Sequence, residues 1–343
     1  MMKTKNWFIA LLALMFLVTT QPVGASAESY SSGTGSKLLI YYATPKLINN
    51  VRDDAAAAAI FAKYDYVVLG AGLESPSHAY NVSTRNIIGL AKSIHPSMKF
   101  FGYVDLGVTT YNYTIDVMQT KVTQWKSMGV SGIFLDDAGY DFQTPRARLN
   151  LMLDYLHSNQ LSGFVNAWKP EDVMGSEVNA AYNPSGIATR MGPNDYYLLE
   201  SFILNTVTSS STYVSNSGYA IGKYIKQRGD KAMNYKKTLG VKMMAINVVD
   251  YVTRTDAQIR KYFEMMEVGS LLFGLDGYGL SAANYSASGT NRFLVKDHAY
   301  NPNYKTLVSS SSSYTTNATL TEFKRAGYTI HNEPSSHWWN FRQ

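Results

Sequence analysis

Acidic residues stand at the ends of several short apolar runs in this chain. Asp136 and Asp137 close one run, Glu200 closes another, and Asp105 and Asp276 close or follow two more. A carboxylate at the end of a buried strand is costly to desolvate unless it is paired or used, and Arg and Lys are scarce at these positions. Crowded carboxylates raise one another's pKa, which gives the protonated and ionised pair that glycosidic hydrolysis requires. We therefore predict that Asp136 and Glu200 are catalytic.

Aromatic and amide side chains occupy the same kind of position and suit a sugar ligand. Tyrosine is unusually frequent, at 26 residues, and it offers both a flat apolar face and a hydroxyl group. We predict that these side chains bind the substrate together with Asp105, Asp137 and Asp276. They are Tyr41, Tyr42, Tyr103, Asn166, Trp168 and Tyr278. For Asp137 a second interpretation stays open, because it could cap the helix that follows, as could Asp141.

Other chemistries find little support in the sequence. The chain has no cysteine, which excludes disulfides, thiolate metal sites and cysteine nucleophiles. Its six histidines are scattered without helical pairing, so we expect no zinc site, although an acidic rim could hold calcium. No serine elbow, phosphate loop or dinucleotide-binding turn is present. We therefore expect neither a metal nor a cofactor.

The elements that must position these residues alternate between short apolar runs and longer amphipathic segments. Such runs are typical of parallel strands that are buried on both faces, and the segments between them, from Leu47–Lys63 onward, have helical spacing. The eight runs are Leu38–Tyr42, Tyr66–Leu69, Phe100–Asp105, Gly132–Asp136, Gly163–Trp168, Tyr196–Ser201, Met243–Val249 and Ser270–Leu275.

Eight such units over roughly 250 residues predict a single-domain (β/α)8 barrel, in which the C-terminal ends of the strands carry the active site. An open doubly wound sheet is the rival, but it usually has fewer strands and a glycine-rich first turn. Two stretches, Lys169–Asn194 and Ser281–Asn317, predict long loops at the C-terminal face. A short helix near Thr319–Ala326 is expected to close the barrel.

The N-terminus has the pattern of a secretory signal peptide. Lys3 and Lys5 precede twelve apolar residues, Trp7–Val18, and small residues follow at Ala25–Ala27. Such a stretch spans about 18 Å as a helix, too short for a bilayer core of about 30 Å. We predict a signal peptide at 1–27, a Ser/Gly-rich spacer at 28–36 and the barrel at 37–343.

These features predict a secreted protein, and the absence of cysteine favours a bacterial one. The net charge of +6 includes the two signal-peptide lysines, and no dense basic cluster indicates a nucleic-acid partner. We expect a monomer that acts on a polysaccharide, with no membrane span after cleavage.

The run Gly132–Asp137 resembles the fourth strand of known barrel hydrolases. The hexapeptide, preceded by a helix that ends in Met-Gly-Val, is similar to that of the endo-α-1,4-polygalactosaminidase and spherulin-4-like families. Phe101–Asp105 is similar to their Gly-Tyr-Val strand, and Glu200 follows at about their spacing. The likeness covers most of Leu38–Gly279. These families cleave exopolysaccharides that contain galactosamine or N-acetylgalactosamine.

The resemblance implies roles for the acidic residues. Asp136 would be the nucleophile or its electrostatic equivalent, and Glu200 the general acid/base. Asp137 matches a position that is often Glu in the spherulin-like group, and its shorter side chain leaves its role open. A deacetylated galactosamine polymer is cationic, so an acidic rim would attract it.

Two rival functions remain from the sequence. One is a catalytically silent carbohydrate-binding barrel of the cell envelope or a biofilm matrix, which would keep the aromatic rim without needing Asp136 or Glu200. The other is an esterase or deacetylase, against which the absence of a serine elbow and of a metal constellation argues.

Overall fold

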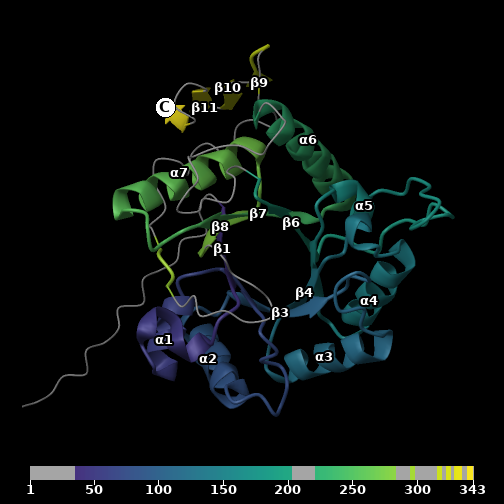
Figure 1. Cartoon of the computed structure of the whole chain (residues 1–343), viewed down its shortest axis with the longest axis vertical. Helices are drawn as coiled ribbons and strands as arrows, with labels where there is room; N and C mark the ends of the chain where they lie inside the picture. Colours follow the sequence, from purple (N-terminus) through teal and green to yellow (C-terminus); the bar gives the residue numbers. More distant parts are fainter. Residues whose placement is uncertain are drawn as a thin grey trace, which may run out of the picture. The chain divides into compact units, whose positions relative to one another are not determined.

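Eight parallel strands close into a barrel in which each strand pairs with the next and β8 pairs with β1 (Figure 1). The fold is therefore a (β/α)8 barrel, as the sequence predicts. The computed structural model describes residues 35–202, 221–282, 294–297, 315–318, 322–325, 328–333 and 338–342. The strands are β1 (Ser36–Tyr41), β2 (Tyr66–Leu69), β3 (Lys99–Asp105), β4 (Gly132–Asp136), β5 (Ser162–Asn166), β6 (Tyr196–Glu200), β7 (Lys242–Val249) and β8 (Gly277–Ala282).

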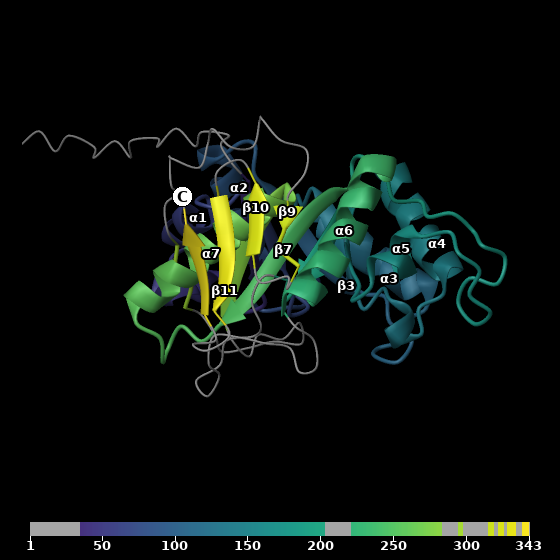
Figure 2. The same cartoon turned by 90° about the horizontal axis from the view of Figure 1, so that it is seen from above.

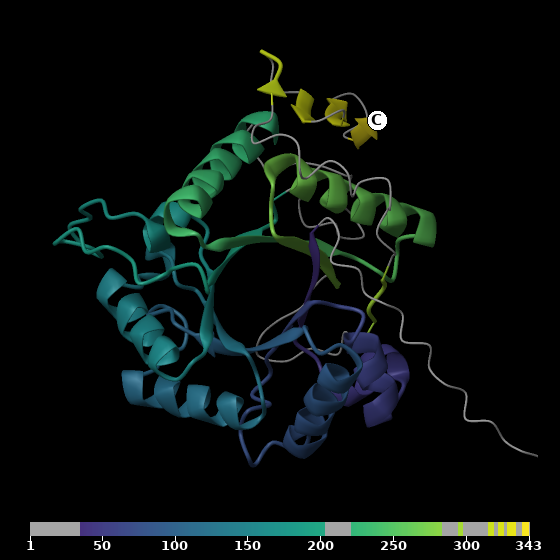
Figure 3. The same cartoon turned by 180° about the vertical axis from the view of Figure 1, so that it is seen from behind.

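Helices surround the barrel, as the reverse view shows (Figure 3). Local signals set several of their ends: the hydroxyl of Thr114 caps α3, and Thr255 forms a capping box with Gln258 at the start of α7. The helices are η1 (Pro45–Asn50), α1 (Asp54–Phe61), α2 (Asn81–Ile94), α3 (Ile115–Ser127), η2 (Tyr140–Phe142), α4 (Arg146–Ser158), α5 (Pro170–Met174), α6 (Ile221–Leu239) and α7 (Asp256–Phe273). The single helix expected over Leu47–Lys63 is divided, because Asn49 and Asn50 have left-handed backbones.

Side chains fill the barrel interior at every second position of the strands. Phe101, Phe134 and Phe164 form its centre, where Phe164 meets each of the other two rings edge-on at a centroid distance of 5.2 Å. The interior is thus a packed core, and a ligand has access only at its ends. The same alternation makes the last residues of β4, β5 and β6 point inward, above this core.

The prediction of the eighth strand is wrong. Ser270–Leu275 covers the end of α7, which stops at Gly274 with φ of 69°, and the strand is Gly277–Ala282. The end of α7 is buried on every side, so it has the uniform apolar composition of a buried strand. The real strand carries glycines that weaken its signal but are needed, since a Cβ on Gly279 would lie 1.9 Å from the Leu38 carbonyl oxygen.

A four-stranded antiparallel sheet packs on the outer side of α7 (Figure 2). Its strands are β9 (Thr315–Thr316), β10 (Glu322–Arg325), β11 (Tyr328–Glu333) and β12 (Trp338–Arg342). The helix expected near Thr319–Ala326 is therefore wrong over the described part of that range. Phe323 of β10 is buried against Phe273 while the next residue, Lys324, is exposed, which is the alternation of a strand.

The described residues all belong to one compact unit, Ser31–Gln343. Residues 1–34, with the predicted signal peptide and most of the spacer, lie outside the described part of the chain, and secretion stays a prediction. Within that described part, no helix combines the length and the apolar character needed to cross a membrane.

Candidate active site

One amide joins the two carboxylates that the sequence singles out. Asn166, the last residue of β5, donates from Nδ2 to Oδ1 of Asp136 at 2.8 Å and to Oε2 of Glu200 at 3.2 Å. An amide NH2 group carries two protons and can serve both acceptors at once. Asp136 ends β4 and Glu200 ends β6, so three adjacent strands bring these side chains together at the C-terminal face of the barrel.

The backbone is strained directly after each carboxylate. Asp137, which follows Asp136, has φ of 54°, and Ser201, which follows Glu200, has φ of 47°. Left-handed conformations are uncommon for residues other than glycine and cluster at functional sites. Both residues are held in place: Ser201 donates its N–H to the Ile246 carbonyl at 2.9 Å, and the Asp137 carbonyl accepts from the Thr144 hydroxyl at 2.8 Å.

Asp136 is held as an ionised acceptor at neutral pH. Burial raises the pKa of its carboxyl to about 6, with the hydrogen bond from Asn166 opposing that rise and the nearby Glu200 adding to it. The Asp137 N–H and the Tyr103 hydroxyl also oppose the rise in pKa, because they hydrogen bond to the charged form. Above about pH 6 this side chain is therefore a carboxylate with several donors fixed around it.

Asp105 and Asp137 form a second acidic pair beside the first. Asp105 is buried and accepts hydrogen bonds from the Gly107 N–H at 3.0 Å and the Thr110 hydroxyl at 2.6 Å. Burial raises the pKa of Asp137 to about 8, and the neighbouring Asp136 and Asp105 add to the rise. The raised pKa favours the protonated form of Asp137 at neutral pH.

Neither Asp137 nor Asp141 caps the next helix. The N-cap of α4 is Pro145, and no side chain accepts a capping hydrogen bond there. The helix-cap interpretation of Asp137 is therefore wrong, and its carboxyl belongs to the acidic cluster.

Tyr42 and Tyr103 lie inside the barrel mouth, as the sequence predicts. Their rings meet edge-on with centroids 5.5 Å apart, and Tyr103 also stacks on Phe134 at 6.2 Å. Gly70 leaves room for Tyr42, because a Cβ there would come within 2.8 Å of its ring. The Tyr103 hydroxyl lies within hydrogen-bond reach of both Asp136 and Asp105 and links the two acidic pairs.

Trp168 stands at the edge of the site with 41% of its surface exposed. The guanidinium of Arg228 lies 4.5 Å from the centre of its ring, and Arg228 also donates to the Glu200 carbonyl oxygen at 2.8 Å. Sequence reasoning missed Arg228, because nothing marks a single arginine in the middle of α6 as reaching the barrel mouth.

Tyr41 is misplaced by the prediction. It ends β1 but faces outward, against Phe61 of α1 with centroids 5.4 Å apart, and its hydroxyl donates to the Thr44 carbonyl. Since side chains alternate across a strand, only one residue of the Tyr41–Tyr42 pair can face the barrel interior, and it is Tyr42.

Asp276 and Tyr278 do not belong to the site, because the eighth strand begins only at Gly277. Asp276 lies at the N-terminal end of the barrel, where it accepts from the Met243 N–H at 2.8 Å and pairs with Lys236 at 2.9 Å. Tyr278 faces outward against Phe263 of α7. Both residues stabilise the opposite end of the barrel or its outer layer.

In the described ranges, no group of three or more His, Asp or Glu side chains is arranged to hold a metal ion. Asp136 and Glu200, joined by Asn166, supply a pair of carboxyl groups. Sequence reasoning named all four acids of the site but missed Thr110, which has no motif to mark it.

No protein-family model matches the chain, and a search of curated proteins finds no match. Similar solved structures include D-psicose 3-epimerase with D-fructose (TM-score 0.41, 10% identity, 74% of this chain and 87% of that one). Others are cellulose synthase subunit Z from Clostridioides difficile (0.43, 9%, 74% and 93%) and an endoglucanase (0.45, 11%, 78% and 95%). The closed eight-stranded sheet of this chain itself shows the barrel fold.

Proposed function

We propose that this chain is a secreted glycoside hydrolase that cleaves an extracellular amino-sugar polysaccharide with Asp136 and Glu200. The observation that carries the proposal is the Asn166 amide, which hydrogen bonds to both carboxylates. Hydrolysis of a glycosidic bond needs two carboxyl groups on opposite sides of the bond, one ionised and one able to donate a proton.

In the proposed mechanism Asp136 is the nucleophile. It is ionised above about pH 6, and the donors around it fix its orientation. Asp136 attacks the anomeric carbon while Glu200 protonates the leaving oxygen, which forms a glycosyl-enzyme ester. Glu200 then removes a proton from water, the water attacks the same carbon, and Asp136 leaves as a carboxylate.

The spacing of the two carboxylates favours this two-step course. Oδ1 of Asp136 and Oε2 of Glu200 lie 2.8 and 3.2 Å from one nitrogen. The sum of these two distances bounds the separation of the oxygens at about 6 Å, near the ~5–5.5 Å of retaining enzymes and below the ~6.5–9.5 Å of inverting ones. We therefore expect the product to keep the configuration of the substrate at the anomeric carbon.

The substrate class follows from charge and from the family resemblance. Four acids gather at the barrel mouth, and such a cluster attracts a cationic polymer such as partly deacetylated galactosamine polysaccharide. Trp168 offers a partly exposed ring on which a sugar could stack. The strand resemblance at Gly132–Asp137 points to the same polymers.

The test is reducing-end release from galactosamine-rich exopolysaccharide by residues 28–343. Asp136→Asn and Glu200→Gln are each expected to lose activity by about 10³-fold or more, since the lost groups act in the transition state. Asp141→Asn, at an exposed acid nearby on η2, serves as the matched control and should keep parental activity.

Proton NMR of the first products reports the anomer and tests retention. Parental activity in both site variants would refute the assignment of the pair. Binding without cleavage by the folded parent, over a panel of polysaccharides, would favour the catalytically silent binding barrel.

A further inference from the structure

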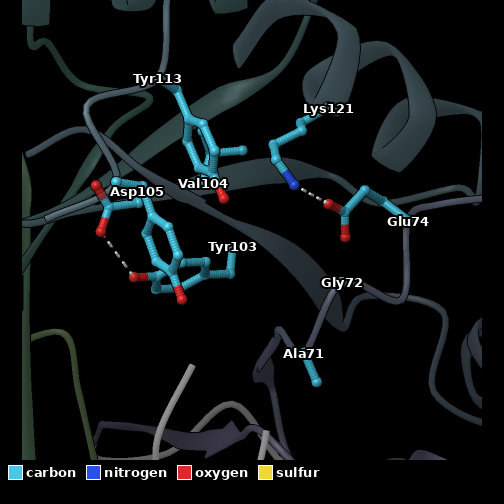
Figure 4. Close-up of a pocket in the computed structure, with 9 residues that line it drawn as sticks. Ala71, Gly72, Glu74, Tyr103, Val104, Asp105, Tyr113 and Lys121 are labelled. Carbon is cyan, nitrogen blue, oxygen red and sulfur yellow. Dashed lines mark hydrogen bonds and ion pairs between the residues drawn. The ribbon is translucent and has the colours of Figure 1, made fainter. Parts of the chain in front are cut away.

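A cavity of about 240 Å³ lies beside the acidic cluster, between the loops that follow β2 and β3 (Figure 4). Tyr103 and Asp105 form one wall, and Lys121 with Glu74 forms the opposite one, with Tyr113 closing the space between them. Drug-sized ligands occupy pockets of about 300–1,000 Å³, so this smaller space suits a single sugar ring. Tyr103 and Asp105 also belong to the site, so the cavity borders the acidic cluster.

The loop after β2 is fixed by its own hydrogen bonds. Ala71 and Gly72 both have positive φ, which turns the chain so that Glu74 lines the cavity. The Asn81 amide then donates to the carbonyls of Leu73 at 2.8 Å and Glu74 at 3.2 Å. This wall of the cavity is thus held in place without a ligand.

The loop after β3 is held in the same way and carries a stacking surface. Arg148 donates to the carbonyls of Leu106 at 2.8 Å and Tyr113 at 2.6 Å. The rings of Tyr111 and Tyr113 lie parallel, with centroids 5.1 Å apart and planes 3° from each other. Tyr111 is 49% exposed, so the pair offers a flat aromatic surface at the cavity.

A buried glutamate pairs with the lysine that lines the cavity. Glu74 is 97% buried, with 3% of its surface exposed, and it accepts from the Lys121 ammonium at 2.6 Å. The same ammonium lies 5.2 Å from the centre of the Tyr113 ring. Glu74 therefore cancels the one positive charge on the lining, and Asp105 leaves the cavity net negative.

We propose that this cavity binds one hexosamine ring of the substrate next to the ring that is cleaved, and that Glu74 admits a cationic ring by neutralising Lys121. This inference rests on the proposed function, because it takes an amino-sugar polymer as the substrate. The ammonium of the ring faces the Asp105 wall, and its apolar face lies on the Tyr111 side. Without Glu74, Lys121 would repel that ammonium.

Two trimers that differ only in charge test the inference. One is α-1,4-linked galactosamine and the other its fully N-acetylated form, with binding measured by calorimetry in the Asp136→Asn background to prevent turnover. Glu74→Gln removes one negative charge from the cavity. It is expected to weaken binding of the cationic trimer about tenfold and to change binding of the neutral trimer less than about twofold. Lys121→Met is expected to tighten the cationic trimer, and the double variant to return it to within about twofold of the parental affinity.

A structural role for the ion pair predicts a different pattern. Equal losses for both trimers in Glu74→Gln, with no recovery in the double variant, would overturn the inference, and melting temperatures report whether each variant is folded. Tyr111→Ala is expected to weaken both trimers alike, because stacking does not depend on charge. Its matched control is Tyr182→Ala, from the stacked Tyr140–Tyr182 pair, which does not line this cavity and should leave both affinities unchanged.

The failure of this inference is separable from that of the proposed function. If the parent cleaves the polymer but substitutions at Glu74 and Tyr111 do not change the affinities for the trimers, the subsite is refuted and the proposed hydrolase activity stands. A parent that binds both trimers with the expected dependence on charge but cleaves no polymer supports the subsite and refutes hydrolysis.

Discussion

Asn166→Ala removes the side chain that joins Asp136 to Glu200, and its effect follows from the hydrogen bonds that are lost. A hydrogen bond to a charged group contributes about 1.5–3 kcal/mol, and one pKa unit corresponds to about 1.36 kcal/mol. The bond from Asn166 lowers the pKa of Asp136, which is about 6 in the intact protein. Its loss should therefore raise that pKa by about one to two units.

The expected readout is a shift of the pH profile. Because Asp136 must be ionised to attack, the acid limb of kcat/KM against pH should move upward by the same one to two units. At pH 6, where half of the parental carboxyl is ionised, the loss should reach about 5- to 50-fold, and it should be smaller at pH 8, where more of the carboxyl is ionised. The assay is reducing-end release measured from pH 4 to pH 9.

Asn150→Ala is the matched control, because the Asn150 side chain also makes two hydrogen bonds but lies away from the site. Its amide donates to the Ala188 carbonyl at 2.9 Å, and its Oδ1 accepts from the Arg190 N–H at 3.0 Å. This variant should lower the melting temperature and leave the acid limb where it is. An acid limb in Asn166→Ala that matches the parent, with only the loss seen in Asn150→Ala, would refute the role assigned to the bridging amide.

Two further predictions concern the other acids. The pKa of Asp137 rises from 3.8 to about 8 on folding, so the folded state binds more protons in that interval, and the resulting stability is lost as the pH rises through about 8. Asp137→Asn should therefore gain melting temperature over the parent at pH 9 and little at pH 5, and equal differences at both pH values would contradict the assignment. Asp276→Asn weakens the contacts to Met243 and Lys236 at the far end of the barrel and should cost about 1 kcal/mol of stability without changing kcat/KM. A loss of activity without a loss of stability would contradict this and indicate that Asp276 acts in the active site.

Much of the fold could be predicted because buried parallel strands have a plain signature. Gly132–Asp136 and Tyr66–Leu69 are short apolar runs with helical segments after them, and the structure gives them the same bounds as the sequence does. The ends of these apolar runs also predicted that Asp136, Asn166 and Glu200 lie at the ends of strands. A barrel then brings such ends to one face, so the cluster followed from the fold.

The eighth strand could not be predicted from apolar composition. Ser270–Phe273 and a buried strand have the same composition, because the helix end is covered by the barrel on one side and by the small sheet on the other. The signal available in the sequence was Gly274 itself, because helices commonly end at a glycine, and in the structure Gly274 has the left-handed backbone of such an end. The error then moved Asp276 and Tyr278 from one end of the barrel to the other.

The cavity beside the site was beyond the reach of the sequence for a different reason. Glu74 and Lys121 are 47 residues apart, and they meet only because the loop after β2 folds against α3. A loop direction that depends on the positive φ of Ala71 leaves no periodic pattern. Sequence periodicity predicts strands and helices, whereas the partners of a loop side chain depend on tertiary packing.

The choice of asparagine between the two acids follows from its place in the barrel. Because β5 lies between β4 and β6, the inward residue that ends β5 lies between Asp136 and Glu200. A lysine or arginine there would lower the pKa of both carboxyls and deprive the leaving oxygen of its proton donor. An aspartate would add a third negative charge, and a leucine would remove the amide donor that the two carboxyls share. An uncharged side chain with two protons on one nitrogen keeps the two oxygens close while leaving one carboxyl free to carry a proton, as the proposed two-step mechanism requires.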